Sequence, residues 1–403
     1  MLSLFFTVIS CKNKALLFAG SNEWINYRHQ ADVWTVYQEL LKRNFDTNDI
    51  RIACYDDIAN NPLNIFKGKI FHDLDHKNNV YGGSDIINYK NKITKETFRE
   101  ALLDLKGTKN DNLFIYYNDH GNIGFVGVPN EEEGSLTSKY LTEIFTELNQ
   151  KNSYKNCIFL IEACLSGSVG EYIEKRMTQS GIKNLAIITA SKANESSNSL
   201  IYDPWINTIL SNQFSSNFID KIREEPECLI SDMFDYIVSN TRYSTPIFYG
   251  EQNIKSMKIS DFIGTTTPVH TKTNNKVKPI TEEMFSQMQY DKSLEKAMDV
   301  KSKMLIKSKR QEEKTKTDVL ISTLNKISSK IYPLKRTKFA NYDDDDDYTV
   351  TDDYLYVLEY FFKIYGGVQQ KDQLKVSKFL LKLSKSVPKE EIIKAIDESI
   401  NAN

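Results

Sequence analysis

Cysteine is scarce in this chain of 403 residues, and its distribution limits how the fold could be held together. Five cysteines occur, none of them in a Cys-x-x-Cys pair and none after Cys228. A disulfide-stapled scaffold and a structural zinc site are therefore not expected, because both need clustered cysteines. An odd number of cysteines leaves at least one thiol free. The candidates for that thiol are Cys11, Cys54, Cys157, Cys164 and Cys228.

Long apolar runs and an excess of charge are also missing. No run of twenty apolar residues occurs, so no membrane-spanning helix is expected. The net charge is −2, which predicts no long-range attraction to nucleic acid or to an anionic membrane. Apolar residues make up 40% of the chain, enough for a sizeable core, and the length favours two domains.

The first ten residues are apolar and are followed by Cys11 and Lys12. This pattern predicts a secretory signal peptide over residues 1–10, although the positive charges that normally precede the apolar core are missing. A first strand is the alternative. A signal would send the chain into the secretory pathway, to a lysosome-like compartment, a vacuole or the outside of the cell.

Strand and helix patterns alternate through the first part of the chain, residues 11–262. Short β-branched or aromatic runs predict strands, and apolar residues at helical spacing predict the helices between them. Two of the strands are continuous apolar runs, which is typical of strands that are covered on both faces. This alternation favours an α/β fold with a mostly parallel open sheet flanked by helices. The predicted strands are 15–19, 50–55, 112–117, 156–161 and 185–189, and the predicted helices are 30–43, 94–105 and 137–148.

The composition and hydrophobic pattern of the sequence change after residue 262. Residues 263–280 are polar with little periodicity, and they are predicted to form a linker. Residues 281–403 carry Lys- and Glu-rich helical patterns, beginning with Thr281 as a capping hydroxyl. We therefore expect a separate all-α unit at the C-terminus, with a solvated loop at the five acids Asp343 to Asp347.

A histidine and a cysteine follow two of the predicted strands. His120 comes after the strand at 112–117, and Cys164 comes after the strand at 156–161, 44 residues later. Parallel strands end at one edge of a sheet, so the two side chains can approach each other. A base beside a thiol raises the thiolate fraction, and the thiolate is the nucleophile. The backbone N–H groups of Gly121 and Cys164 could stabilise an oxyanion. An ordinary loop histidine and a buried cysteine are the alternative.

Three motifs extend this pair. They are Asn118-Asp-His-Gly121, Glu162-Ala-Cys-Leu-Ser-Gly-Ser168 and Asn26-Tyr-Arg-His-Gln-Ala-Asp32. Together, and over roughly residues 14–255, they resemble the legumains, which are asparaginyl endopeptidases with a caspase-like fold. The related GPI-anchor transamidases share the His-Gly and Cys pattern, but they usually read Asp-Thr-Cys-Gln around the cysteine and often carry a C-terminal membrane helix.

The resemblance implies roles for the matched residues. His120 would be the general base, Cys164 the nucleophile that forms a thioester, and Asn26 the residue that orients the histidine. Water would hydrolyse the thioester, whereas an amine would give a peptide ligase or transamidase. Asp119 matches a position prone to succinimide formation. An inactive caspase-fold adaptor is the alternative that is not an enzyme. No cofactor is implied.

The resemblance also implies a pocket for asparagine. An amide presents both an acceptor and donors, so a cation and an anion should face it, and Arg28 and Glu162 would supply them. Asp220, on a loop after the fifth strand, is the candidate for a further acid. Such a pocket would accept aspartate only when its carboxyl is protonated, at acid pH. The other candidates are His29 beside the site and Ser191 and Ser216 in the walls.

His72 and His76 could suggest a metal, but their acidic surroundings suit a solvated loop equally well, and no metal is expected. By the resemblance, residues 281–403 would be a prodomain that covers the active site and is released by acid self-cleavage. Asn274-Asn275 offers a cleavage site, and the mature core would end within 253–285. The expected partners are therefore protein or peptide substrates and the chain's own prodomain.

Overall fold

The computed structural model describes residues 12–130, 134–269, 280, 282–297, 299–332 and 347–400. The predicted signal peptide at 1–10 lies outside these residues, as do Thr281 and the Asn274-Asn275 pair. Within the described part, no helix is long and apolar enough to cross a membrane.

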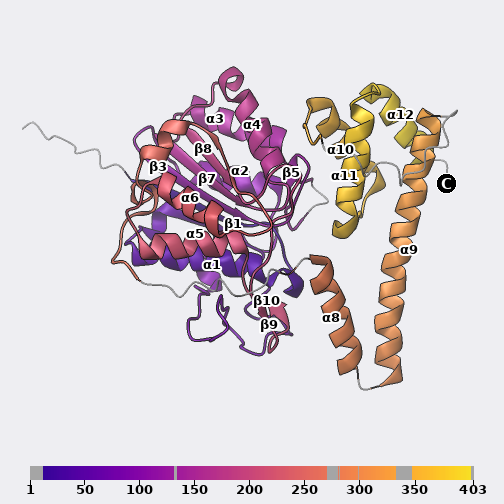
Figure 1. Ribbon diagram of the computed structural model, residues 1–403, viewed down its shortest axis with the longest axis horizontal. Coiled ribbons are helices and arrows are strands. Elements are labelled where there is room, and N and C mark those ends of the chain that lie inside the picture. Colours follow the sequence, from indigo (N-terminus) through magenta and orange to yellow (C-terminus); the bar gives the residue numbers. More distant parts are fainter. Residues whose placement is uncertain are drawn as a thin grey trace, which may run out of the picture.

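A six-stranded sheet forms the centre of the N-terminal part of the molecule (Figure 1). Its strand order is β11-β8-β7-β3-β1-β2, and all neighbouring strands run parallel except β11, which is antiparallel to β8. The predicted mostly parallel open sheet is confirmed. The strands are β1 Asn13–Ala19, β2 Ile50–Ala53, β3 Asn112–Asn118, β7 Asn156–Glu162, β8 Leu185–Thr189 and β11 Ile247–Gly250.

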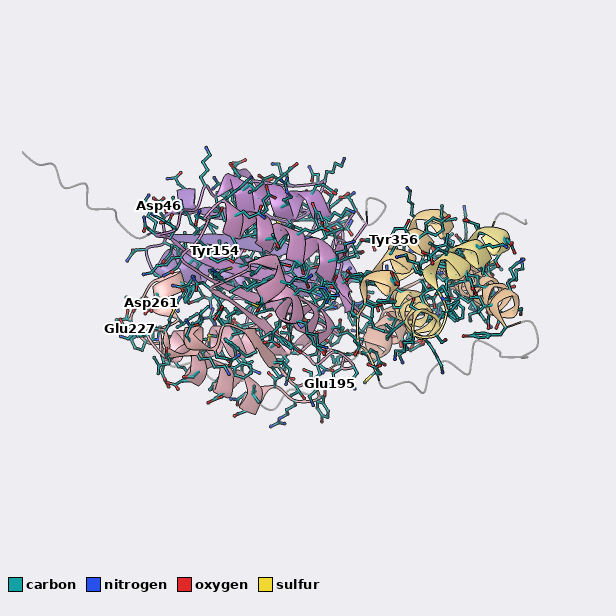
Figure 2. The ribbon with its side chains drawn as sticks, turned by 90° about the horizontal axis from the view of Figure 1, so that it is seen from above. Asp46, Tyr154, Glu195, Glu227, Asp261 and Tyr356 are labelled. Carbon is teal, nitrogen blue, oxygen red and sulfur yellow. The ribbon has the colours of Figure 1, made fainter. Side chains whose placement is uncertain are left out.

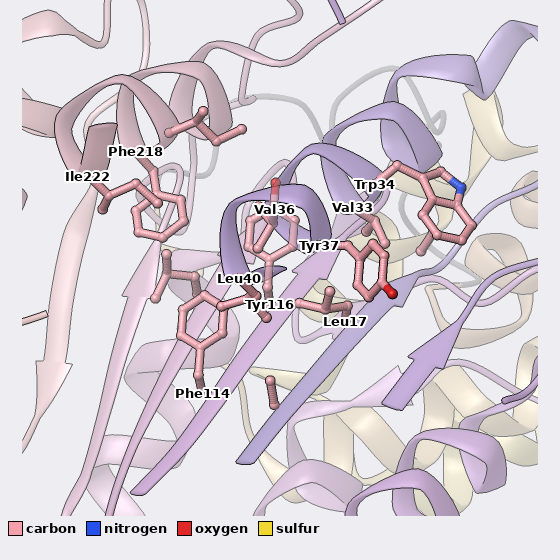
Figure 3. Close-up of a cluster of buried hydrophobic side chains, with 14 of the residues drawn as sticks. Leu17, Val33, Trp34, Val36, Tyr37, Leu40, Phe114, Tyr116, Phe218 and Ile222 are labelled. Carbon is pink, nitrogen blue, oxygen red and sulfur yellow. The ribbon is translucent and has the colours of Figure 1, made fainter. Parts of the chain in front are cut away.

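Helices cover both faces of this sheet. Core residues from α1, α5, α6 and α7 pack on one face, and those from α2, α3 and α4 pack on the other. Figure 3 shows α1 lying over the first face, with Val36 and Leu40 pointing toward the strands. The helices are α1 Tyr27–Lys42, α2 Lys95–Asp104, α3 Ser138–Gln150, α4 Gly167–Ser180, α5 Gln213–Glu224, α6 Ile230–Asn240 and α7 Ser260–Ile263.

Burial on both faces explains why β3 and β7 are continuous apolar runs. All seven residues of β3 are buried, as are the last six of β7. The flanking helices begin at hydroxyl caps where the sequence places them. The Thr94 side chain accepts a hydrogen bond from the N–H of Thr97 at the start of α2, and Thr137 accepts one from Tyr140 at the start of α3.

The central pair of strands brings two polar segments to the same edge. Asn118 at the end of β3 is paired with Glu162 at the end of β7, and the N–H of Asp119 donates to the Glu162 carbonyl oxygen at 3.0 Å. His120 and Cys164 each stand two residues beyond the end of their strand. The sheet register therefore delivers both side chains to one edge.

Short strands and 3-10 turns complete the N-terminal part. One small sheet joins β4, β5 and β6, and a hairpin joins β9 and β10. These elements are β4 Gly121–Asn122, β5 Phe125–Val126, β6 Leu136–Thr137, β9 Tyr202–Asp203, β10 Thr208–Ile209, η1 Trp24–Asn26, η2 Thr47–Asp49, η3 Ser84–Ile86 and η5 Gln252–Ser256.

The described C-terminal part consists of helices joined by short irregular segments, as the sequence predicts. Figure 2 shows these helices at one end of the molecule, with Tyr356 labelled on α10. Apolar residues of α9 to α12 form a core of their own, which also includes Ile123, Leu165, Phe125 of β5 and Tyr172 of α4. The helices are α8 Glu282–Lys296, α9 Val300–Ile331, α10 Asp352–Tyr365, α11 Gln370–Ser384 and α12 Lys389–Ile400.

The hydrophobic centre between the two layers of helices should tolerate truncation poorly. Phe159 is fully buried between Phe98 and Phe145, with ring centroids 5.9 and 5.7 Å away. Phe159→Ala is expected to lower the free energy of unfolding by about 3–5 kcal/mol, because it leaves a cavity. Leu63, which is 62% exposed, is the control: Leu63→Ala should stay within about 0.5 kcal/mol of wild type. Urea unfolding measures both, and equal effects would contradict the assignment of the core.

Candidate active site

Cys164 stands at the start of a tight turn between β7 and α4. Leu165, the next residue, has a φ of 51°, a left-handed conformation that non-glycine residues adopt at some cost. Its N–H donates to the Glu195 carbonyl oxygen at 2.8 Å, which holds the turn. The Cys164 thiol is half-buried and lies 3.6 Å from the carbonyl oxygen of Ser197. The thiol is thus fixed in position and remains partly accessible.

His120 is hydrogen-bonded to Asn26, the residue that the resemblance proposes for orienting it. The Nε2 atom of His120 lies 2.8 Å from the Asn26 side-chain oxygen, and the Asn26 amide donates to the carbonyl oxygen of Asn22 at 2.9 Å. The amide is therefore turned so that its oxygen faces the histidine. An amide oxygen can only accept, so Nε2 carries the proton of the neutral ring and Nδ1 carries the lone pair. That is the protonation state a general base needs.

His120 and Cys164 line the same cleft. One part of the cleft is bounded by residues of η1, α1 and the segment before α5, and an adjoining part is bounded by Gly121, Asn122 and residues of α11. Both parts include His120 and Cys164. The structure thus brings together the two residues that the sequence singles out.

Gly121 is required by the close approach of two chain segments. A Cβ atom at this position would lie 2.1 Å from the Cys164 carbonyl oxygen and 2.9 Å from the Ala163 Cβ. Only glycine allows the two backbones to pass so closely. The proposed use of the Gly121 and Cys164 N–H groups as oxyanion donors remains a prediction.

Arg28 lies in the cleft, on the first turn of α1, but it does not pair with Glu162. Its Nε donates to the side-chain oxygen of Asn212 at 3.1 Å, and one terminal nitrogen donates to the carbonyl oxygen of Ile25 at 3.2 Å. Asn212, just before α5, lines the same cleft. Sequence reasoning missed Asn212, because it follows none of the predicted strands and belongs to no motif that was recognised.

Glu162 is buried beneath the cleft. Its carboxylate accepts hydrogen bonds from the N–H and the hydroxyl of Ser215, both at 2.9 Å, and only 1% of the residue is exposed. Burial, together with the negative charge of Asp32, raises the pKa of Glu162 to about 8. Glu162 is therefore a neutral acid under mildly acidic conditions.

Asp220 lies apart from the cleft. Its segment belongs to helix α5, not to a loop, because Phe214, Phe218 and Ile222 recur at helical spacing and face the core. The charged groups that act on its carboxyl include Arg223 and His72, and burial raises its pKa to about 6. Asp220 is not among the residues that line the cleft within the described chain.

The two serines proposed for the walls lie behind the cleft surface. The Ser191 hydroxyl donates to the Ala163 carbonyl oxygen at 3.3 Å and lies 3.4 Å from the hydroxyl of Ser166, so it supports the turn at Cys164. Ser216 is buried on the first turns of α5. Neither is among the described residues that line the cleft.

His29 and Asp119 stand beside His120. The His29 ring meets the His120 ring edge-on, with centroids 4.7 Å apart, and its Nδ1 lies 3.4 Å from an Asp119 oxygen. Burial keeps the pKa of His29 well below its usual range, so the ring is neutral. The three residues offer ligand atoms within 4.8 Å of one another and are the donors that a divalent ion would use. Succinimide formation at Asp119 and the absence of a metal remain predictions.

His72 and His76 do not form a solvated loop, one of the two alternatives considered for them. His72 is buried, with Nε2 2.7 Å from an Asp32 oxygen, and His76 pairs with Asp203. The Asp32 hydrogen bond raises the pKa of His72 in spite of its burial, which has the opposite effect. Each histidine is thus paired with a carboxylate, an arrangement that sequence reasoning could not foresee, because the partners lie 40 and 127 residues away.

Comparison with known proteins settles the family. The sequence profile of the Peptidase C13 family matches residues 13–265, which is more than half of the chain. The chain belongs to the Peptidase C13 family.

Individual members of this family align over the same region. A hemoglobinase from Schistosoma japonicum is 32% identical over 271 residues, covering 64% of this chain and 61% of that protein. A legumain from Rattus norvegicus is 29% identical over 268 residues, covering 63% of this chain and 59% of that protein. The chain thus matches about three fifths of the length of these C13 relatives. The resemblance to legumains is confirmed.

A solved structure of caspase-1 from Spodoptera frugiperda also aligns, at 11% identity and a TM-score of 0.38, covering 64% of this chain and 91% of that one. A score this low supports no conclusion about this C13 chain. The architecture rests on the sheet described above.

The buried acid Glu162 should make the stability of the protein depend on pH. A carboxyl whose folded-state pKa is raised from its usual 4.5 to about 8 binds a proton on folding, so stability is lost as the pH rises through that interval. Glu162→Gln removes the ionisable group and can still accept from Ser215. The melting temperature of the variant minus that of wild type should therefore increase between pH 5 and pH 8.

Glu143→Gln, at an exposed position on α3, is the matched control and should show no such trend. Thermal melts at each pH measure both differences. A Glu162→Gln difference that stays constant across this range would contradict a neutral buried Glu162.

Proposed function

We propose that this chain is a cysteine endopeptidase that cleaves after asparagine. Cys164 attacks the peptide carbonyl, His120 takes up the thiol proton at Nδ1, and the resulting thioester is hydrolysed by water. The observation that carries the proposal is the convergence of His120, held by Asn26, and Cys164 in one cleft at the edge of the sheet. Membership of the Peptidase C13 family supports it.

The same cleft supports a pocket for the residue before the scissile bond. Arg28 and Asn212 lie on its wall together with His29 and Ser199. A guanidinium donates to the carbonyl oxygen of an asparagine side chain, and the surrounding carbonyl and carboxylate oxygens accept from its amide. Asparagine, with one acceptor and two donors in a short side chain, fits a wall of this kind.

We further propose that the C-terminal helices keep the enzyme latent. Ile280 forms an antiparallel bridge with Ser199, where its N–H donates to the Ser199 carbonyl oxygen and its own carbonyl oxygen accepts from the Ser199 hydroxyl at 2.6 Å. Phe285 of α8 is buried, and it lines the cleft together with Ile280. A segment paired in this way occupies the space that a substrate backbone would need.

Contacts on the other side of the cleft also hold the C-terminal helices in place. We call these helices, α8 to α12, the cover. Gln370 and Leu374 of α11 line the part of the cleft that includes Gly121. The buried Tyr354 hydroxyl donates to the Ile123 carbonyl oxygen at 3.0 Å. Leu355 packs so closely against Gly124 that a Cβ atom on this glycine would lie 2.9 Å from the Leu355 side chain. Figure 1 shows α10 and α11 beside β5 and α8 beside β9 and β10, so the helices flank the cleft on two sides.

One ionic contact between the two parts involves Asp352 on α10. The Tyr172 hydroxyl donates to its carboxylate, and Arg176 lies 2.8 Å from it. Tyr172 and then Arg176 lower the pKa of Asp352 below its usual 3.8, although partial burial opposes them. The stability from this contact is present above that usual value and is lost as the pH falls through the lowered pKa. Asp352 is exposed, so this contact is a small part of what holds the C-terminal helices in place.

An acidic compartment, such as a lysosome-like organelle or a vacuole, suits the catalytic part of the chain. Burial raises the pKa of Glu162 to about 8 and that of Asp220 to about 6. Both carboxyls are in the catalytic part of the chain, and both destabilise the fold as they ionise with rising pH. The catalytic part should therefore be more stable in mild acid than at neutral pH.

The catalytic assignment predicts the effect of removing either partner. Because neither variant could process itself, both are processed in trans by wild-type enzyme that is then removed. Cleavage of a fluorogenic Ala-Ala-Asn peptide should fall on the order of 10⁴-fold or more in Cys164→Ala and in His120→Ala. Cys228→Ala, which changes a buried cysteine outside the cleft, is the control and should retain activity. Turnover that survives in Cys164→Ala would exclude this mechanism.

Running the same assay with a peptide amine separates the alternatives. Amide product in excess of hydrolysis would make the chain a ligase or transamidase on the same residues. An absence of any turnover after activation would favour an inactive adaptor.

Weakening the packing of the cover should increase the activity of the uncut chain. Leu355→Ala should raise the cleavage rate of the intact, uncut chain at pH 6, because it removes apolar packing worth about 2–5 kcal/mol at the boundary. Leu305→Ala, on the exposed surface of α9, is the matched control and should leave the intact chain latent. Intact mass measured beside the activity shows that the chain is uncut. A wild-type chain that is fully active before any cleavage would refute the cover.

A further inference from the structure

Arg28 is a cation in the cleft without a carboxylate partner. Within the described residues, it forms no ion pair within 4.0 Å, and its hydrogen-bond acceptors are the side-chain oxygen of Asn212 and the carbonyl oxygen of Ile25. Most of the buried cations elsewhere in the chain do have such partners; Arg43, for example, is paired with Glu39 at 2.7 Å. Arg28 is buried to 93% and still faces the cleft, so its charge is not dissipated by solvent.

The amide of Asn212 is fixed in one orientation. Its oxygen accepts from Arg28, while its NH₂ group donates to an Asp32 oxygen at 2.7 Å and to the Asn118 side-chain oxygen at 3.1 Å. Turning the amide over would place its NH₂ group against the guanidinium and its oxygen against the Asp32 carboxylate. Both changes are unfavourable, so the neutral oxygen of Asn212 is held at Arg28.

The acids around Arg28 are each engaged elsewhere. Asp32 accepts from Asn118, Asn212 and His72, and Glu162 accepts from Ser215. Asp119 accepts from the Tyr117 hydroxyl at 3.3 Å and lies beside His29. The titratable groups that surround Arg28 in the cleft and beneath it are His29, Asp32, Asp119, His120, Glu162 and Cys164.

We propose that Asn212 is a specificity-determining residue: it leaves Arg28 available to a substrate carboxylate, so that the enzyme cleaves after ionised aspartate as well as after asparagine near neutral pH. This inference rests on the proposed endopeptidase function. Aspartate and asparagine have the same shape, and they differ only in donors, acceptors and charge. A hydrogen bond from a guanidinium to a carboxylate is stronger than one to an amide oxygen, which favours the ionised form.

The proposal replaces the expectation that aspartate is accepted only when protonated. That expectation assumed that Glu162 and Asp220 would present negative charges beside Arg28. Glu162 is bonded to Ser215 beneath the cleft, and Asp220 faces Arg223 and His72. Neither repels an incoming carboxylate at Arg28.

The test compares Ala-Ala-Asp and Ala-Ala-Asn reporter peptides with the acid-activated enzyme. In wild type, the ratio of kcat/KM for the two peptides should change less than about threefold between pH 5 and pH 7. In Asn212→Asp, a carboxylate stands beside Arg28, so the ratio at pH 7 should fall by about 10-fold or more and recover toward pH 4.5. Arg28→Gln should reduce cleavage after aspartate more than cleavage after asparagine.

The outcomes separate this inference from the proposed function. Cleavage of the Asn peptide, with the Asp peptide cut by wild type only below pH 5, would overturn the role of Asn212 and leave the endopeptidase intact. Cleavage of neither peptide would overturn the endopeptidase itself. If Asn212→Asp fails to fold, which its melting temperature shows, the wild-type pH profile and Arg28→Gln still decide the question.

Discussion

The pairing of β3 with β7 is the constraint on which the site depends. With Asn118 opposite Glu162, the next residues of both strands leave the sheet at one edge, and His120 and Cys164 reach a common cleft. A shift of this register by one residue would reverse the direction in which each side chain points. The apolar faces of both strands prevent such a shift, because they are buried under helices on both sides. Core packing and catalytic geometry are thus fixed by the same hydrogen-bonded pair.

Beneath the cleft lies a buried polar network centred on Asp32. It links α1 to the strand ends and to α5 through Asn118 and Asn212, which both donate to the same Asp32 oxygen. Buried polar groups are costly unless they are bonded, and a fully bonded network fixes one arrangement of the elements that carry it. The network therefore orients the segment before α5 and, through Asn212, the guanidinium of Arg28. In the proposed specificity, this network acts on the substrate through Arg28.

Much of this architecture could be predicted from the sequence, for reasons that are local. Continuous apolar runs predicted β3 and β7, and apolar residues at helical spacing predicted α1. The hydroxyl of Thr94 predicted the start of α2. The proposed nucleophile and base were singled out by their places after two strands and by the motifs around them. The pocket could not be predicted in the same way. Asn212 contacts Arg28 although the two residues are 184 positions apart in the sequence, and no short pattern encodes that contact. Asp220 does not line the cleft, because its segment is part of helix α5 and not a loop.

We propose that a reactive Cys164–His120 pair lies at the edge of the sheet and is covered by residues of the C-terminal part, such as Phe285. The alkylation rate of Cys164, followed by peptide mass in the intact and the acid-processed chain, tests this most directly. Slow alkylation is predicted in the intact chain, fast alkylation after processing, and a return to slow alkylation in His120→Ala that has been processed in trans by wild-type enzyme. Alkylation of processed Cys164 no faster than that of the buried Cys157 would contradict it.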